Sequence, residues 1–308
     1  MQVGITSDRV RYIKLGEKGK WEEECLTTGI VRLGFNTAQH FDLISSGQWD
    51  AYGQTYAAAG KTKGKVTEIV GQVSLFAEDD GSILWITFWR RKMWWCFIDP
   101  ASPLAPHPDG SGTFRRTLNG WHSSALNGTE LHMEDLSGHI TQLAGYRGTC
   151  CDAKDPGYVV RRVNGEKLQE VEDAETLLAD LEAVIIRMMR RLTPGDFELL
   201  VDLIFAASGW RRLGGVGGTA KLVDMELLLP TTGERAFVQV KSEAKQKEFN
   251  EEYAETFTQM SQFGRMFYAF HSGKVKCDDE NITLLGPDRL ASMVMDAGLA
   301  SWLMRRIA

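Results

Sequence analysis

The stretch LVDMELLLPTTGERAFVQVKS, residues 222–242, decides the fold of the second half of the chain. Two apolar runs flank the turn PTTGER, and this pattern predicts two antiparallel strands joined as a hairpin. Period-two alternation along the second run places Gln239 and Lys241 on one face of their strand, while Val238 and Val240 face the other side. A buried strand that projects an amide and a lysine together indicates a chemical site.

Asp224, in the first strand, completes this candidate site. There are 14 residues between it and Gln239, so the two can lie side by side across the hairpin. A carboxylate that holds Mg²⁺ lets the metal polarise a phosphate and lower the pKa of a bound water, and a lysine stabilises the charge that develops nearby. The pattern therefore predicts phosphodiester cleavage. The structural alternative is that Asp224 ends a turn and that Lys241 extends its charge into water from an edge strand.

The segments on either side of the hairpin predict the remaining elements of an α/β domain. TPGD at 193–196 supplies a capping hydroxyl, a proline in the first turn and an acid three residues later, which predicts a helix start. That helix carries Glu198. A polar helix over about 244–262, a strand at RMFYAFHS (265–272) and a final helix from Pro287 follow.

This arrangement resembles the PD-(D/E)xK nuclease superfamily, and within it the Mrr-like restriction endonucleases, over about residues 193–292. The resemblance rests on TPGDFELLVDLIFAASGW, on the glycine-rich turn before LVDMEL, and on FVQVKS, which matches a branch with Gln in place of the usual Glu. It implies an α/β restriction-endonuclease-like domain, a central mixed sheet flanked by helices. In that fold Asp224 is a metal ligand, Gln239 contributes to the metal site, Lys241 is the catalytic lysine and Glu198 matches the helical acid. Mg²⁺ is the implied cofactor, with Mn²⁺ as a substitute.

Residues 1–160 predict a separate, mostly β recognition domain. Its apolar runs are separated by Gly, Asp and Asn: GIVRLGF (29–35), EIVGQVSLF (68–76), ILWITFW (83–89) and MWWCFI (93–98). The charged residues between the last two runs predict a tight hairpin.

The polar segment 152–174 is the predicted boundary, and the nuclease-like domain is expected over 175–308. From Glu175 the apolar residues recur at helical spacing, which predicts an amphipathic helix with a core-facing stripe. The stripe consists of Leu177, Leu178, Leu181, Val184, Ile185, Met188 and Leu192.

The first domain is rich in tryptophan, and most of these rings are expected in its core. Those nearest the strands, with one in the opening segment, are candidates for a pocket that stacks a base: Trp21, Trp85, Trp89, Trp94 and Trp95. Alternation sends Trp94 and Trp95 to opposite faces. The opening YIKLGEKGKWEEECLTTGIVRLGF and the domain order resemble the PUA-like group of the EVE and YTH types. That resemblance implies a pocket for a flipped, modified base.

Three arginines are candidates for phosphate contacts: Arg115, Arg116 and Arg147. Three histidines, His122, His132 and His139, are candidates for a metal site, and the alternative is that they are unrelated surface and core residues. The net charge of −6 divides almost evenly between the halves, so contact with DNA requires a local cationic patch.

Taken together, these features predict a DNA endonuclease directed by its first domain against modified or foreign DNA, and a homodimer where both strands are cut. The alternatives are an effector or repair nuclease activated by a nucleotide signal, and a catalytically weak DNA-binding protein. No apolar run reaches about 18 residues and no leader pattern opens the chain, so a cytoplasmic protein without a membrane partner is expected.

Overall fold

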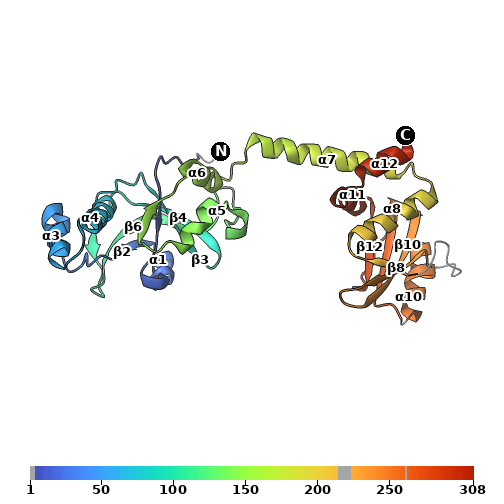
Figure 1. Cartoon of the computed structure of the whole chain (residues 1–308), viewed down its shortest axis with the longest axis horizontal. Helices are drawn as coiled ribbons and strands as arrows, with labels where there is room; N and C mark the ends of the chain where they lie inside the picture. Colours follow the sequence, from blue (N-terminus) through green and yellow to red (C-terminus); the bar gives the residue numbers. More distant parts are fainter. Residues whose placement is uncertain (1–3, 214–222, 261) are drawn as a thin grey trace. The chain divides into compact units, whose positions relative to one another are not determined.

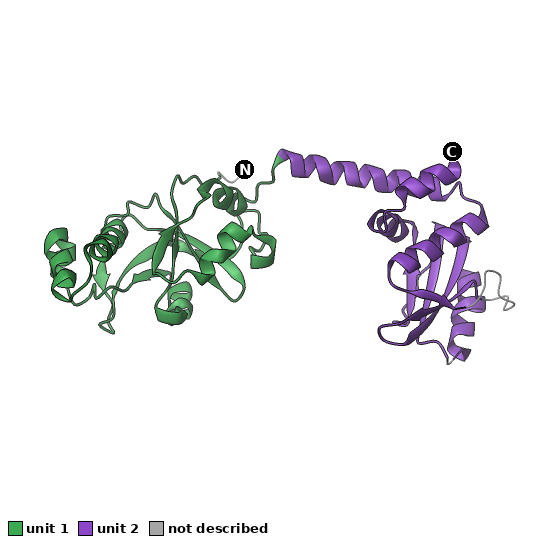
Figure 2. Cartoon of the chain, in the orientation of Figure 1, with its two compact units in different colours: residues 1–168 green, residues 169–308 purple. Residues whose placement is uncertain are grey.

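A computed structural model of the chain describes residues 4–213, 223–260 and 262–308. The chain divides into two compact units, Met1–Leu168 and Gln169–Ala308 (Figure 2). Each unit is mixed α/β, with a mixed sheet flanked by helices (Figure 1). The division falls inside the polar segment 152–174. The predicted glycine-rich turn, 214–221, lies outside the described residues.

Unit 1 is built on a seven-stranded sheet in the order β2-β6-β4-β3-β1-β7, with β5 paired to β6. Its strands are β1 (Val10–Ile13), β2 (Ile30–Leu33), β3 (Leu84–Trp89), β4 (Lys92–Ile98), β5 (Ala105–Pro106), β6 (Thr113–His122) and β7 (Cys150–Asp152). Among the described strands of this sheet, β1 and β3 pair in parallel and the other pairs are antiparallel.

The predicted hairpin of unit 1 is confirmed, because β3 and β4 pair in register from Leu84 opposite Phe97 to Trp89 opposite Lys92. Arg90 and Arg91, at φ 48° and 61°, make the two-residue turn.

Helices cover both faces of this sheet, so it has two cores. The helices of unit 1 are η1 (Glu17–Gly19), α1 (Glu22–Thr28), α2 (Phe41–Ser45), α3 (Trp49–Ala58), α4 (Lys63–Ala77), η2 (Met133–Asp135), α5 (Gly138–Thr141), η3 (Gln142–Gly145) and α6 (Pro156–Asn164). Side chains of α1 to α4 pack on one face, around Val73 and Trp85. Side chains of α5 and α6 pack on the other face, around Val159 and Trp95.

The prediction of a mostly β first domain is wrong, because residues 68–76 form the C-terminal part of α4 rather than a strand. Ile69, Val73 and Phe76 recur at spacings of four and three, and all three are buried. Thr62 caps the helix by accepting a hydrogen bond from the Lys65 backbone N–H. The apolar residues of this run therefore recur with a helical period, but the run is short enough to resemble a buried strand. Likewise, α6 occupies part of the segment expected to be a polar connection.

Unit 2 is built on a five-stranded sheet in the order β12-β11-β10-β9-β8. Its strands are β8 (Arg211–Leu213), β9 (Met225–Leu229), β10 (Glu234–Ala244), β11 (Arg265–Gly273) and β12 (Ile282–Leu285). Its helices are α7 (Gln169–Met189), α8 (Pro194–Ala207), α9 (Gln246–Glu248), the π-helical turn η4 (Phe249–Ala254), α10 (Glu255–Gln259), α11 (Pro287–Asp296) and α12 (Ala300–Ile307). The predicted antiparallel hairpin is β9 with β10, and β11 adds to β10 in parallel.

The two faces of the unit 2 sheet pack against different helices. Side chains of α7, α8, α11 and α12 cover the face that carries Val238. Those of η4 and α10 cover the face that carries Phe237. Strand β10 is therefore buried on both sides, and the side chains at 239 and 241 share the face of η4.

The predicted apolar stripe of α7 is only partly a core stripe. Ile185 and Met189 are buried, but Leu177 and Leu178 are 68% and 54% exposed, and Leu181 and Val184 are exposed as well. The helix begins at Gln169 rather than at Glu175, and only its C-terminal turns pack against the unit 2 core. No helix among the described residues is both long enough and apolar enough to cross a membrane.

Candidate functional site

Asp224 lies where the pairing of β9 with β10 stops, immediately before Met225 pairs with Val238. Its backbone N–H donates to the Val238 carbonyl at 3.2 Å. Its carboxylate accepts a hydrogen bond from the Val240 backbone N–H at 2.7 Å, with Oδ2 as the acceptor. The strand end thus aims this carboxylate along β10 toward position 239.

Gln239 is 3% exposed, and its Nε2 donates to the same Asp224 Oδ2 at 2.6 Å. With the amide in this orientation, Gln239 Oε1 is buried and has no hydrogen-bond partner within the described part of the chain. A buried acceptor without a donor is costly, so this oxygen needs an electropositive neighbour. Asp224 and Gln239 are therefore in direct contact, and this pair of buried polar side chains contains an acceptor oxygen that is not yet used.

Lys241 lies two residues further along β10, on the same face as Gln239. Its Nζ is 3.2 Å from Glu248 Oε1 and 5.1 Å from the centroid of the Tyr253 ring. Burial alone would lower the pKa of this ammonium, but hydrogen bonds with Tyr253 and Glu248 and the negative charge of Glu248 raise it above its ordinary value. Lys241 therefore acts as a fixed positive charge and not as a proton acceptor at neutral pH.

The π-helical turn explains why Glu248 and Tyr253 meet at Lys241. They are five positions apart, and a regular α-helix turns residues at that spacing onto different faces. The i→i+5 pattern of η4 brings them nearer to one face, and Tyr253 Oη lies 3.5 Å from Glu248 Oε1.

Glu198 reaches the site from α8 through Arg212 on β8. Arg212 Nη2 lies 3.6 Å from Glu198 Oε1 and donates to the Asp224 carbonyl at 3.1 Å, while Nη1 lies 3.5 Å from Asp202 Oδ2. Burial and then the charge of Asp224 raise the pKa of Glu198, so the two carboxyl groups are close enough to interact. Burial also raises the pKa of Asp224, although the Val240 N–H opposes this.

These residues fit a divalent metal ion of the Mg²⁺ type. Mg²⁺ prefers oxygen ligands and keeps several waters, so it needs only one or two protein carboxylates. Asp224 would supply a carboxylate, and Gln239 Oε1, buried and unpaired among the described residues, would supply a neutral oxygen ligand. Among the described residues no cluster of three His, Cys, Asp or Glu side chains could hold a metal, so any ion here would be bound by this smaller set.

Four residues of this site escaped sequence analysis: Asp202, Arg212, Glu248 and Tyr253. Asp202 was detectable, because it lies four positions after Glu198 on the same helix face. Arg212, Glu248 and Tyr253 come from elements whose approach to β10 is set by packing, and no local pattern marks them.

The tryptophans proposed for a base pocket in unit 1 do not gather at one place. Trp85 is fully buried, with its Nε1 donating to Asp79 at 2.7 Å, and Trp95 is buried with its Nε1 donating to the Ser124 carbonyl at 2.9 Å. Both are core residues, which corrects their assignment as pocket candidates. Trp94 does face away from Trp95, as predicted, but it packs beside Trp89 against the core on the α1 to α4 side of the sheet. These rings do not form an open pocket because helices cover both faces of this sheet.

Trp21 is different, because it lines a pocket of 620 Å³ in unit 1 together with Arg147. Arg115 is not free for a phosphate: it is 4% exposed, and its guanidinium donates to the Ser102 and Asp79 carbonyls. Arg116 is exposed beside it on β6 and remains a candidate for phosphate contact.

The three histidines do not form a metal site in the described structure. His122 packs against Trp95, with ring centroids 4.7 Å apart, and His132 pairs by a β-bridge with Lys92.

Comparisons of this chain with protein-family models, with curated proteins and with solved structures found no match.

The raised pKa values of Asp224 and Glu198 predict how unit 2 responds to pH. A carboxyl group whose folded pKa lies above its unfolded pKa binds more protons in the folded state, so its contribution to stability is present at low pH and is lost as pH rises through that window. We expect the contribution of Asp224 and Glu198 to the stability of the metal-free protein to be lost as pH rises above the ordinary carboxyl pKa of about 4. Mg²⁺ should reverse the loss, because it binds the ionised carboxylate. Thermal unfolding of unit 2 with and without Mg²⁺ measures this; a stability that rises over the same window without metal would contradict it.

Proposed function

We propose that this chain is a metal-dependent nuclease, and more particularly a DNA endonuclease whose active site lies in unit 2 and whose unit 1 selects the substrate. The observation that carries the proposal is that Asp224, just before β9, contacts Gln239 within β10, with Lys241 two residues further along the same face and Gln239 Oε1 buried and unpaired within the described residues. The mixed sheet of unit 2, with helices on both faces, is compatible with the restriction-endonuclease-like fold. For unit 1 the PUA-like assignment stays a proposal that rests on sequence resemblance.

In this proposal Asp224 and Gln239 hold Mg²⁺, or Mn²⁺ as a substitute. When bound, such an ion polarises a phosphate and lowers the pKa of a bound water. Lys241, kept charged by Glu248 and Tyr253, stabilises negative charge on the phosphate as it develops. Arg212 holds Glu198 toward the site, where its carboxyl group can accept or release a proton.

The test uses supercoiled plasmids that carry or lack modified bases, each incubated with the purified full chain and Mg²⁺, Mn²⁺ or a chelator. We expect nicking or linearisation that needs the metal and depends on the plasmid. Linear product without a nicked intermediate at higher protein concentration would support a homodimer that cuts both strands. Binding without cleavage under all conditions would favour the alternative of a DNA-binding protein.

Substitution of Gln239 tests whether its neutral side chain is a ligand of the metal ion. Gln239→Glu places a second carboxylate against Asp224, so the metal-free protein should be less stable and Mg²⁺ should bind more tightly. An added unit charge a few Å from the ion stabilises it by more than about 1 kcal/mol at an effective dielectric constant near 20, which corresponds to a decrease on the order of tenfold in the Mg²⁺ concentration required.

The measurement is the Mg²⁺ dependence of cleavage and of the melting temperature. Gln259→Glu, at the exposed end of α10, is the matched control for added charge. If both variants respond to Mg²⁺ alike, Gln239 does not contact the metal.

A further inference from the structure

A pocket of 620 Å³ in unit 1 is assembled from four segments that are distant in sequence. Its walls come from the segment after β1, the end of β2, the turn before β6 and the segment before β7. Its volume is typical of sites for small molecules, which span about 300–1,000 Å³. Six of its side chains carry the argument: Lys14, Lys18, Lys20, Trp21, Phe35 and Arg147.

The pocket is cationic. Three lysines and one arginine line it against a single acidic residue, Glu17. In the part of the chain that the structure describes, no ion pair joins any of these four cations to a carboxylate. Lys14 Nζ donates to the Tyr146 carbonyl, which holds it next to Arg147. A concave surface with unneutralised positive charge attracts an anion, and an arginine fits a phosphate especially well.

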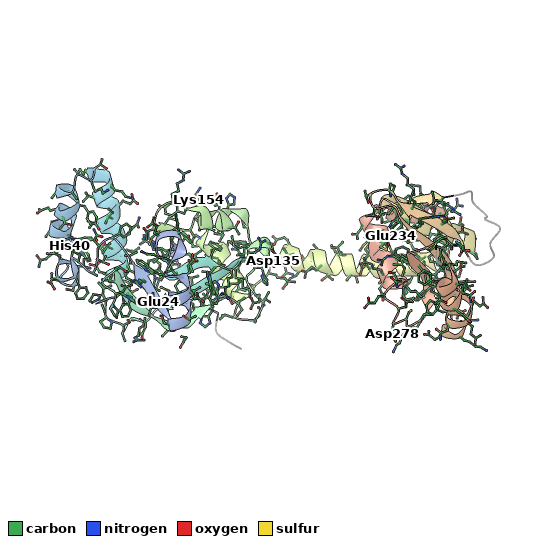
Figure 3. The ribbon with its side chains drawn as sticks, turned by 90° about the horizontal axis from the view of Figure 1, so that it is seen from below. Glu24, His40, Asp135, Lys154, Glu234 and Asp278 are labelled. Carbon is green, nitrogen blue, oxygen red and sulfur yellow. The ribbon has the colours of Figure 1, made fainter. Side chains whose placement is uncertain are left out.

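The aromatic wall is held rigidly in place. The Arg32 guanidinium lies 4.1 Å from the centroid of the Trp21 ring, and Arg32 is only 1% exposed. Its charge is neutralised by Asp109 and by Glu24 of α1, labelled in Figure 3, at 2.8 Å, and the hydrogen bond from Arg32 keeps the pKa of Asp109 below its usual range. Arg32 therefore positions the indole and does not itself recognise an anion.

Another wall of the pocket is a tight turn with non-glycine residues in the left-handed region. Phe35 and Asn36 have φ values of 60° and 50°. The Phe35 carbonyl accepts hydrogen bonds from the buried hydroxyl groups of Tyr52, at 2.6 Å, and Tyr56. Backbone held in a sparsely populated conformation by buried partners is typical of ligand sites.

We propose that this pocket binds a nucleoside phosphate, with the phosphate among Lys14, Lys18 and Arg147 and the base against Phe35 and Trp21, where it replaces the Lys20 ammonium that lies 5.0 Å from the centroid of the Trp21 ring. A planar ring stacks on an aromatic side chain whatever its identity, and the cations account for the phosphate. The ligand is either a free nucleotide or a nucleotide unstacked from a DNA strand, because both present the same chemistry. The role given to the bound nucleotide, selection of a substrate, rests on the proposed function. Binding itself does not, because the pocket lies entirely within unit 1.

Calorimetric titration of the full chain tests the proposal at low ionic strength, without divalent metal. The probes are the four deoxynucleoside monophosphates, the corresponding nucleosides and inorganic phosphate. We expect at least one monophosphate to bind more tightly than its nucleoside and than inorganic phosphate, because only the nucleotide engages both the aromatic side chains and the cations. No binding of any monophosphate at millimolar concentration would overturn the proposal, and so would equal binding of inorganic phosphate and the nucleotides.

Variants distinguish the contribution of the cations from that of the aromatic side chains. Arg147→Gln and Lys18→Gln alter exposed side chains, so the fold should persist, and each should weaken nucleotide binding by about tenfold while leaving nucleoside binding unchanged. Lys154→Gln, at the exposed lysine labelled in Figure 3, is the charge-matched control and should leave both unchanged. Trp21→Phe should weaken nucleotide and nucleoside alike, because it reduces the stacking surface. An equal effect of Arg147→Gln and Lys154→Gln would overturn the assignment of the phosphate site.

The source of the ligand is distinguished with oligonucleotides in an Asp224→Asn chain, which should not cut. A duplex with one mismatched pair, a matched duplex and the free monophosphate are compared. If the mismatched duplex binds more tightly than the matched duplex, the ligand is a base taken from DNA. If the free monophosphate binds more tightly than either duplex, the ligand is a soluble signal. Both outcomes support the pocket. Since these readouts do not need cleavage, loss of the nuclease proposal would leave them intact.

Discussion

Asp224→Asn and Lys241→Met should each reduce Mg²⁺-dependent cleavage by about 10²–10³-fold or more. Asp224 accepts hydrogen bonds from Val240 and Gln239, and an asparagine oxygen keeps an acceptor there while the charge that attracts the metal is lost. Lys241 is held as a fixed cation by Glu248, so methionine removes the charge and keeps most of the side-chain volume. Both variants should therefore keep the melting temperature of unit 2 close to that of the parent.

The measurement is the single-turnover rate of plasmid nicking, with the melting temperature recorded in parallel. The matched controls are Asp278→Asn, at the exposed residue labelled in Figure 3, and Lys247→Met on α9, which is also exposed. Both controls should cleave at the parental rate. If either active-site variant cleaves within a few-fold of the parent, that residue has no part in the chemistry and the proposed function loses its main support.

Trp85→Ala should destabilise unit 1 by about 3–5 kcal/mol, the usual cost of truncating a buried aromatic residue. The ring is fully buried against Phe76, with ring centroids 5.9 Å apart, and its Nε1 donates to the buried Asp79. Alanine leaves a cavity and removes one of the two hydrogen-bond donors to that carboxylate, the other being the Gly81 backbone N–H. For a unit of this size the loss corresponds to a decrease of about 6–20 °C in melting temperature.

Calorimetry of the full chain measures this effect and also tests the independence of the two units. The transition of unit 1 should move down while that of unit 2 stays in place. Trp89→Ala is the control, because Trp89 is only half-buried and its ring carries the Arg90 guanidinium at 4.0 Å on one side. It should cost much less. Equal shifts for Trp85→Ala and Trp89→Ala would show that Trp85 is not the centre of this core, and a joint shift of both transitions would show that the units unfold together.

The alternation along β10 determined which side chains share a face. Gln239 and Lys241 face η4 while Val238 and Val240 face α8, because a strand has a period of two wherever it lies. The hairpins and the capped start of α8 were equally predictable, since turn residues and caps act over a few positions. These are local properties that a sequence carries by itself.

The tertiary structure decided which distant groups meet. Arg212 reaches Glu198 because β8 adds to the edge of β9, and Glu248 reaches Lys241 because a π-helical turn packs on β10. In unit 1, helices on both faces of the sheet buried Trp85 and Trp95, and four separate segments built the pocket beside Trp21 instead. Local periodicity fixes the direction of a side chain relative to its own element, whereas the neighbours of that side chain depend on how whole elements pack, and no short-range pattern encodes this packing.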